Sequence, residues 1–476
     1  MGGRTMLVAA VLVWAGPALA AEVGTEPAGV ERLDLAACIE RALVAAPDLA
    51  TARAAVDVRE AKLARARRSK YLPEAGLLST TGAAPRARGR IDADSSCRGN
   101  PQCLAENRVR DTTSTRQYGP FSRVEVGFVQ PLWTWGKITA GIEAATAAVE
   151  QEVAASAEKR AEVVEQVKTL YYNVLLARAV EGVVVETRDA FVSALKTARE
   201  RREKGDAKIT ELDILNLRVG VAEVAKEIPH LQAGAIGALE ALRRLMGLPL
   251  DAPVDLKDRR LEPEETPLRP LEEYEATLFR TNPAWKQIVA GVEAKSNEVK
   301  KVEADYFPNV FVKGGFEYSY APERTRQINP FAYDDYNYLR GPGGELGVSW
   351  LLNFHVTAAK VATKRAELVR LESEQRSAQT GLPVELRDTY RRVLQTREAL
   401  EQLVDGRKAG RAILTFAVTN FDLGIGEPTD IFAGLGNYGR VSSNYFEAVR
   451  DHNLARAALA RLMGEAGAAP AASAVP

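Results

Sequence analysis

Apolar residues between Gly136 and Glu203 recur at steps of three and four residues. Val163, Val167 and Val174 are examples, and this spacing places apolar side chains along one stripe of an amphipathic helix. The stretch contains no proline, and roughly 65 residues in a helix span about 100 Å. Helices of globular proteins average about 11–12 residues. No compact domain can surround such a rod, so the stretch predicts a coiled coil, a helical array or a tube.

Four shorter segments alternate between apolar and polar or small residues, which indicates β-strands. The strands are expected at about 74–82, 121–132, 309–320 and 344–354. In the third of them, Val312, Phe316 and Tyr318 share one face and Lys313, Glu317 and Ser319 share the other. An apolar, aromatic face opposite a small, charged face is typical of a membrane-spanning barrel strand. A half-solvated sheet of a soluble protein has the same period, so the pattern alone leaves this alternative open.

The second half of the chain repeats the motifs of the first half in the same order. The matching pairs are Ala46-Pro47 with Asn282-Pro283, Tyr71-Leu72-Pro73 with Tyr306-Phe307-Pro308, and Leu245-Met246-Gly247 with Leu462-Met463-Gly464. One constant offset also carries Tyr171, Val174, Leu175 and Gly205 onto Tyr390, Val393, Leu394 and Gly424. A constant offset over a whole helix indicates two copies of one structural unit.

These observations divide the chain into four parts. Residues 1–20 are expected to be a signal peptide, because Arg4 precedes an apolar run from Met6 to Trp14 and Ala18-Leu19-Ala20 forms a small-residue cleavage site. Residues 21–270 are the first repeat and a connector, with helices at about 137–204 and 213–246. Residues 271–464 are the second repeat, with helices at about 357–422 and 430–463. Residues 465–476 are expected to be a disordered tail. Pro229 and Pro383 lie inside predicted helices and should kink or break them.

The predicted strands cannot form a complete membrane structure within one chain. Small barrels need about eight strands, and unpaired strand edges are not tolerated in lipid. Further copies of the chain must therefore complete the sheet, and three copies give twelve strands.

In each half, the helix before the strands and the helix after the glycine turn together match the long helix in length. Two short helices stacked end to end can thus lie beside one long helix.

Composition narrows the function. The chain has 63 Lys and Arg against 63 Asp and Glu, and this balance argues against a nucleic-acid partner. There is no Ser/His/Asp order, nucleophile elbow, phosphate loop or dinucleotide fingerprint in the sequence. His230, His355 and His452 do not show metal-ligand spacing. We therefore predict neither enzymatic activity nor a cofactor or metal site.

The three cysteines also carry information. Cys97 and Cys103 bracket a short loop, and in an exported protein they are expected to form a disulfide that contributes about 2 kcal/mol. A metal pair is the alternative, although there is no His nearby. Cys38 is left without a partner and is expected to be buried in an early helix.

The layout resembles the TolC-like outer-membrane efflux channels over about residues 31–464. The resemblance rests on the repeated Ala/Asn-Pro, Tyr-x-Pro and Leu-Met-Gly motifs and on Gln130-Pro131-Leu132 with Gly136. It implies a mixed fold of α-helices and transmembrane β-strands. The homotrimer would have a 12-stranded barrel in the outer membrane and a long α-helical coiled-coil tunnel in the periplasm. Trp133, Trp135 and Trp350 would lie in the aromatic belt against outer-membrane lipid.

The resemblance also implies a passive export duct of a tripartite efflux pump or a type I secretion system. Its partners would be a periplasmic adaptor protein and an inner-membrane pump. The alternative is a periplasmic coiled-coil adaptor or scaffold without a channel, which accounts for the helices and the signal peptide but not for two strand pairs. An exported hydrolase is disfavoured because the sequence shows no nucleophile arrangement.

By this resemblance the periplasmic tip of the tunnel has glycine turns at Gly205, Gly424 and Gly426. Its constriction would comprise Asp213, Asn216, Glu427 and Asp430, where three symmetric carboxylates attract cations. Phe421, Gly426 and Ala433 replace the polar residues that lock the tip in the family pattern, so the sequence does not say how the tip closes. Asp213 and Asp430 also begin helices, where an Asp N-cap contributes about 1 kcal/mol. Capping and gating are compatible.

Overall fold

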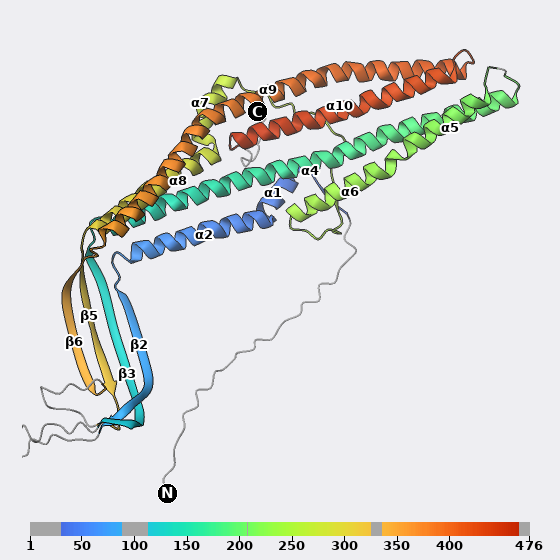
Figure 1. Cartoon of the computed structure of the whole chain (residues 1–476). Helices are drawn as coiled ribbons and strands as arrows, with labels where there is room; N and C mark the ends of the chain where they lie inside the picture. The colour runs from blue at the N-terminus through green and yellow to red at the C-terminus, as the bar shows by residue number, and fades with distance from the viewer. Residues whose placement is uncertain (1–29, 88–112, 207, 325–335, 466–476) are drawn as a thin grey trace, which may run out of the picture.

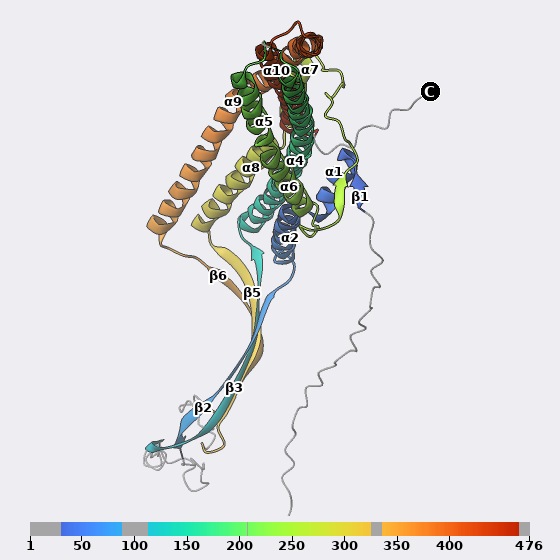
Figure 2. The same ribbon diagram turned by 90° about the vertical axis from the view of Figure 1, so that its right-hand side faces the viewer.

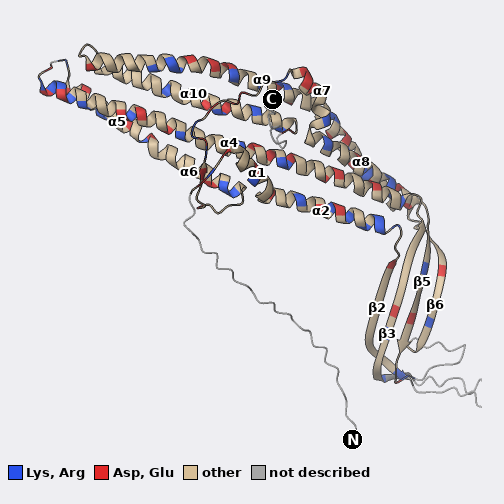
Figure 3. Cartoon of the chain, turned by 180° about the vertical axis from the view of Figure 1, so that it is seen from behind, with Lys and Arg blue, Asp and Glu red and all other residues tan. Residues whose placement is uncertain are grey.

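The computed structural model describes residues 30–87, 113–206, 208–324 and 336–465. The predicted signal peptide, the Cys97–Cys103 pair and the tail beyond Glu465 lie outside these residues. Figure 1 shows an elongated molecule with a four-stranded sheet at one end and a long array of helices leading away from it. The view turned by 90° in Figure 2 shows the same separation between strands and helices. Charged residues are spread along the helices, whereas the strands carry few of them (Figure 3).

The first repeat contains two short helices, two strands and the long helix with its return. These are α1 (Leu35–Ala45), α2 (Pro47–Arg68), β2 (Glu74–Ala87), β3 (Thr113–Trp133), α4 (Lys137–Glu203), α5 (Glu211–Ala225) and α6 (Glu227–Leu245). Two three-residue strands, β1 (Glu31–Leu33) and β4 (Val254–Leu256), pair in parallel and tie the start of the chain to the connector.

The second repeat has the same order of elements. These are α7 (Leu271–Thr281), α8 (Pro283–Glu303), the 3-10 helix Ala304–Tyr306, β5 (Asn309–Tyr320), β6 (Tyr338–Ser349), α9 (Phe354–Asp422) and α10 (Pro428–Leu462). Prolines at the first positions of α2 and α8 suit a helix start, because proline has no N–H to leave unpaired. None of the described helices is long and apolar enough to cross a membrane.

Pro229 breaks its helix as expected, whereas Pro383 lies inside a continuous helix. The expected single helix at 213–246 is interrupted at Lys226 between α5 and α6, because the Pro229 ring clashes with the carbonyl of residue 225. In contrast, α9 runs through Pro383 without a break. Figure 1 shows that α9 changes direction along its length, so the proline is absorbed in a bent helix.

The observed strand bounds also differ from the expected ones. Strand β2 extends to Ala87 and β3 begins at Thr113, so both are longer than the sequence pattern indicates. Strand β6 spans 338–349 and not 344–354, because its Gly341-Pro342-Gly343-Gly344 run has the composition of a turn. Pro342 lies where the register between β5 and β6 shifts, between the partners of Gly315 and Glu317, and prolines in strands occur at such irregularities.

The long helices are the axis of packing in each repeat. Helix α4 contacts α2, α5 and α6 of its own repeat, and α9 contacts α8 and α10. Figure 1 shows α2 and the α5–α6 pair one after the other along α4, which confirms the expected end-to-end stacking. The face of α4 near the sheet buries small residues at Ala140, Ala144 and Ala147, and α8 packs there against α4. Small residues let the two backbones approach closely.

Three apolar clusters stabilise the helical array. The largest joins α1, the middle of α4, α6 and the connector, and it includes Cys38, which is fully buried as expected. Burial raises the pKa of the Cys38 thiol to about 12, with Asp34 adding to the effect, so this cysteine is unreactive. A second cluster holds α4 and α5 against α9 and α10, towards the tip. The third joins α7 to α9 and α10.

Candidate functional site

The four-stranded sheet has one apolar face. Strands β2, β3, β5 and β6 are antiparallel and follow this order in space. The register places Leu77, Val126 and Phe316 directly opposite one another on one face. Large apolar side chains there are open in the single chain, with Leu77 71% exposed and Leu346 73% exposed. A continuous apolar surface of this kind is typical of contact with another protein or with lipid.

The opposite face is charged. Glu125 of β3 pairs in register with Glu317 of β5, and Lys313 of β5 with Glu345 of β6. Arg123 Nε lies 3.6 Å from Glu317 Oε1, and Arg340 Nη1 lies 3.8 Å from Glu317 Oε2. A face with this many charges requires water. One side of the sheet is therefore suited to lipid and the other to an aqueous interior.

The three predicted interface tryptophans lie where the strands meet the helices. Trp135 Nε1 donates a 2.7 Å hydrogen bond to the carbonyl of Pro308, which joins the two repeats. Trp350 Nε1 donates to the carbonyl of Tyr306 at 3.1 Å. Trp133 is exposed and meets Trp135 edge to face. Indoles with one bonded N–H and an exposed ring are typical of the boundary between lipid and water.

At the far end of the helices, the predicted constriction residues begin the return helices. Thr210 is the N-cap of α5, and its N–H donates a 2.9 Å bond to Asp213 Oδ2. Glu427 is the N-cap of α10, and its N–H donates to Asp430 Oδ2 at 3.3 Å. The two aspartates therefore complete capping boxes from the third helical position, and the expectation that they are themselves N-caps is wrong. Asn216 is exposed on α5.

The turns at this tip use glycine for two reasons. Gly205 and Gly424 have φ values of 85° and 82°, a left-handed conformation in which a side chain is strained. Gly426 has no such φ value. A Cβ atom there would lie 2.9 Å from the backbone nitrogen of Phe421, so Gly426 permits a close approach of two chain segments.

A contact that the sequence did not predict joins the two turns. The Arg201 guanidinium donates hydrogen bonds of 2.9 and 2.6 Å to Asp206 Oδ2 and one of 2.9 Å to the carbonyl of Phe421. It also lies over the Phe421 ring, 5.1 Å from its centre. The Lys208 backbone N–H and Arg201 together lower the pKa of Asp206. Arg201 therefore stays ion-paired while it binds the end of α9. We name Arg201, Asp206 and Phe421 the tip clasp.

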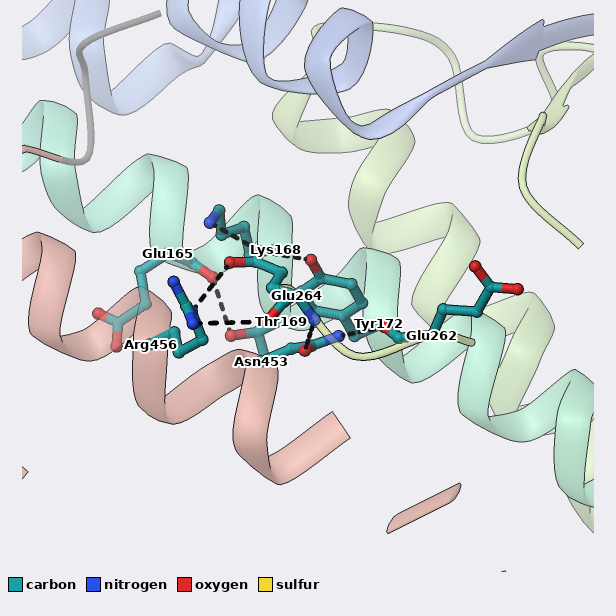
Figure 4. A network of polar contacts seen from close by, with 8 residues as sticks. All are labelled: Glu165, Lys168, Thr169, Tyr172, Glu262, Glu264, Asn453 and Arg456. Atoms are coloured by element: carbon teal, nitrogen blue, oxygen red, sulfur yellow. Dashed lines mark hydrogen bonds and ion pairs between the residues drawn. The ribbon is translucent and has the colours of Figure 1, made fainter. Parts of the chain in front are cut away.

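A second polar network lies about midway along the helices (Figure 4). Glu264 of the connector accepts hydrogen bonds from Lys168 Nζ at 3.1 Å and from the Tyr172 hydroxyl at 2.7 Å, both on α4. Its backbone N–H donates to Asn453 Oδ1 of α10 at 2.8 Å. Burial raises the pKa of Tyr172, and the Glu264 carboxylate raises it further, so this hydroxyl stays a donor. The connector thus fastens the first repeat to the second.

Comparison with known proteins follows this geometry. Residues 38–248 match the sequence model of the family described as outer membrane efflux protein. The matched stretch runs from within α1 to just past the end of α6, so the first repeat resembles this family. This resemblance implies an outer-membrane protein whose helices extend into the periplasm. No curated protein matches the chain.

Solved structures share the fold over nearly the whole chain. The outer-membrane channel OprN is 18% identical with a TM-score of 0.71, and the alignment covers 90% of each chain. The outer membrane protein VceC from Vibrio cholerae is 15% identical with a TM-score of 0.69, covering 90% of this chain and 96% of its own. CusC is 12% identical with a TM-score of 0.70, covering 93% and 95%.

These likenesses confirm the fold class. The four strands are one third of a 12-stranded barrel that forms only in the trimer, and the helices contribute one third of the tunnel. The apolar face of the sheet is therefore its outer face, and the charged face lines the interior.

Proposed function

We propose that three copies of this chain form the passive exit duct of a tripartite efflux pump or a type I secretion system. The observation that carries the proposal is the unfinished sheet, with one apolar face, one charged face and β2 and β6 at its edges. Pairing of β6 with β2 of the next copy closes the barrel and leaves no edge in the lipid. The resulting interior continues into the space between the helices.

The duct itself supplies no energy. The energy for export comes from an inner-membrane pump, and a periplasmic adaptor joins this pump to the exposed turns at the helix tips. The family and the similar structures are channels and not enzymes, which supports a purely passive role.

The tip is the gate of the proposed duct. Asp213, Asn216, Glu427 and Asp430 lie at or near the starts of α5 and α10, so three copies bring their side chains together around the axis. Carboxylates at such a constriction favour cations. The tip clasp holds α4 and α9 together within each copy, where Phe421 and Gly426 offer no polar side chain for a lock. We propose that release of this clasp accompanies opening.

Fractionation and bilayer recording test the duct. The purified protein should require detergent, sediment with three times the mass of the chain and produce discrete conductance steps in planar bilayers. A monomer that stays in aqueous extracts and gives no conductance would support the alternative of a periplasmic scaffold.

A further inference from the structure

A cavity lined by described residues lies where the sheet meets the helices. Its volume is about 790 Å³. Five cationic side chains line it, from four different elements: Lys62 and Arg65 of α2, Lys137 of α4, Lys301 of α8 and Lys313 of β5. There is no aspartate or glutamate among the described residues of its lining. We call these five residues the junction cations.

Most of this charge is not neutralised inside the chain. Lys137 Nζ binds Asp305 Oδ1 at 2.5 Å. Within the part of the chain that the structure describes, the side chains of the other four junction cations make no hydrogen bond or ion pair. Glu74 and Glu345 lie on the same face of the sheet, opposite Val129 and Lys313 in register, but neither lines the cavity. Unpaired like charges around one hollow repel one another unless an anion enters.

The cavity opens towards the interior of the duct. The strand residues that line it include Val129, Phe311 and Lys313, and the register places Val129 beside Lys313 on the charged face of the sheet. Threefold symmetry repeats the cavity around the axis. A ring of cations then surrounds the passage between the tunnel and the barrel. Its field reaches about 8 Å into the solution at physiological ionic strength.

We propose that this cavity binds an oxyanion, namely a phosphate, carboxylate or sulfonate group of a solute that passes through the duct. The lysine ammonium groups offer compact positive charges, and Arg65 offers a fork of N–H donors that matches two oxygens of such a group. The assignment of the ligand to a passing solute rests on the proposed function, whereas the binding of an oxyanion rests on the cavity alone. Anionic lipid headgroups carry the same chemistry, but the cavity lies on the face of the sheet that turns away from lipid.

The junction cations give the two ends of the tunnel opposite preferences for the charge of a solute. Carboxylates at the tip favour cations, whereas the junction cations favour anions. A solute that carries both charges, or an anion that enters from the tunnel, therefore meets a favourable site directly below the barrel. This site is part of the duct wall and not of the gate.

Neutralisation of three lysines tests the site. The variant carries Lys62→Gln, Lys301→Gln and Lys313→Gln, all exposed residues, so folding and trimer formation should be unaffected. A matched control carries Lys196→Gln, Lys226→Gln and Lys408→Gln, which lie on exposed helix surfaces outside the cavity. The probe is inorganic pyrophosphate, and titration calorimetry measures its binding to the detergent-purified trimer.

The original protein and the control should bind pyrophosphate alike, and the triple variant should bind it at least about tenfold more weakly. In planar bilayers with a KCl gradient, the triple variant should also shift its reversal potential towards potassium selectivity. Equal pyrophosphate binding by the triple variant and the original protein would overturn the site. Loss of conductance in all three proteins with pyrophosphate binding intact would refute the duct and leave the site in place.

A second arm identifies the source of the anion. The original protein is reconstituted in nanodiscs of phosphatidylcholine alone or of phosphatidylcholine with phosphatidylglycerol. Equal pyrophosphate binding in both supports a site that opens to the interior. Abolished binding in the phosphatidylglycerol discs would show that a lipid headgroup occupies the cavity and would overturn the assignment to a passing solute.

Discussion

Arg201 and Phe421 are 220 residues apart in the sequence, yet the Arg201 guanidinium donates a 2.9 Å hydrogen bond to the Phe421 carbonyl. The bond joins the end of α4 in the first repeat to the end of α9 in the second. The Arg201 side chain is only 15% exposed, so water competes weakly for it. The acceptor is the backbone carbonyl of Phe421, and no substitution at that position removes it. The bond can therefore be tested only by substitution of Arg201.

Arg201→Gln should open the tip. A hydrogen bond from a charged group contributes about 1.5–3 kcal/mol, so its loss should raise the open fraction by about tenfold or more. Single-channel recording measures this as a higher open probability. Arg202→Gln is the matched control, because Arg202 pairs with Glu211 of its own repeat. If Arg202→Gln opens the channel equally, charge near the turn and not the clasp controls it.

Two substitutions of Asp430 distinguish a role in helix capping from a role in gating. Asp430→Asn removes the charge but keeps an oxygen for the Glu427 N–H, whereas Asp430→Ala removes both. If the Asp430 carboxylate acts in the gate, both variants should lose the preference of the channel for cations in planar bilayers. Only the alanine variant should also lose about 1 kcal/mol of stability in thermal unfolding, through its capping box. Unchanged cation preference in both variants would leave Asp430 with a capping role alone.

The sequence pattern predicts elements and their duplication better than contacts between repeats. The three- and four-residue spacing in α4 and the alternation in β5 are local properties, so one sequence is enough to read them. The tip clasp is not local. Arg201 and Arg202 are adjacent and chemically identical, and only the folded path of α9 distinguishes them. Threonine at 210 likewise became the N-cap because Asp213 can reach back from the third helical position.

The junction cations illustrate the same limit. Lys62, Lys137, Lys301 and Lys313 belong to four elements, and each is an ordinary solvent-facing residue of its own pattern. Only the turn of the helices away from the sheet places them around one cavity. The prediction of the start of β6 was wrong for a different reason. The residues from Gly341 to Gly344 have the composition of a turn, but pairing with β5 makes them part of a strand.

The midway network should contribute measurably to stability. Glu264→Gln weakens the ion pair with Lys168 and the hydrogen bond from Tyr172, in a partly buried site. We expect a loss of about 1–3 kcal/mol, seen as a lower midpoint in thermal or denaturant unfolding of the purified trimer. Glu262→Gln is the matched control, because Glu262 takes part through its backbone carbonyl only and its carboxylate points away from the network (Figure 4). Equal losses in both variants would contradict the role of the Glu264 carboxylate.

His452 should make stability depend on pH. This buried side chain lies 3.2 Å from the Thr396 hydroxyl. Burial lowers its pKa, Arg456 and Arg397 lower it further, and Glu264 partly opposes them. The folded chain therefore holds His452 neutral, whereas the unfolded chain takes up a proton below about pH 6.5. This contribution to stability is complete above that pH and is lost as the pH falls towards the folded pKa.

The measurement compares unfolding midpoints at pH 7.5 and 5.5. His452→Gln keeps a polar group near Thr396 but cannot titrate, so it should show a smaller decrease in stability between these two pH values. His230→Gln replaces an exposed histidine and should decrease as the original protein does. An unchanged decrease in the His452 variant would mean that other groups set the pH dependence.

The last prediction concerns a row of glycines on the inner face of the sheet. Gly76, Gly127 and Gly315 lie opposite one another in β2, β3 and β5, and Gly343 of β6 continues the row. A Cβ atom at Gly315 would collide with the Val126 carbonyl oxygen and lie 2.9 Å from the Gly127 Cα. Gly315→Ala must therefore push β5 away from β3, where the two repeats meet in the sheet. At Gly76 there is no atom within 4 Å of an added Cβ, so Gly76→Ala should leave the sheet intact.

We expect Gly315→Ala to reduce the yield of heat-resistant trimer in outer membranes severalfold, and Gly76→Ala to match the original protein. Similar yields for both variants would show that β3 and β5 need not approach this closely for the barrel to assemble.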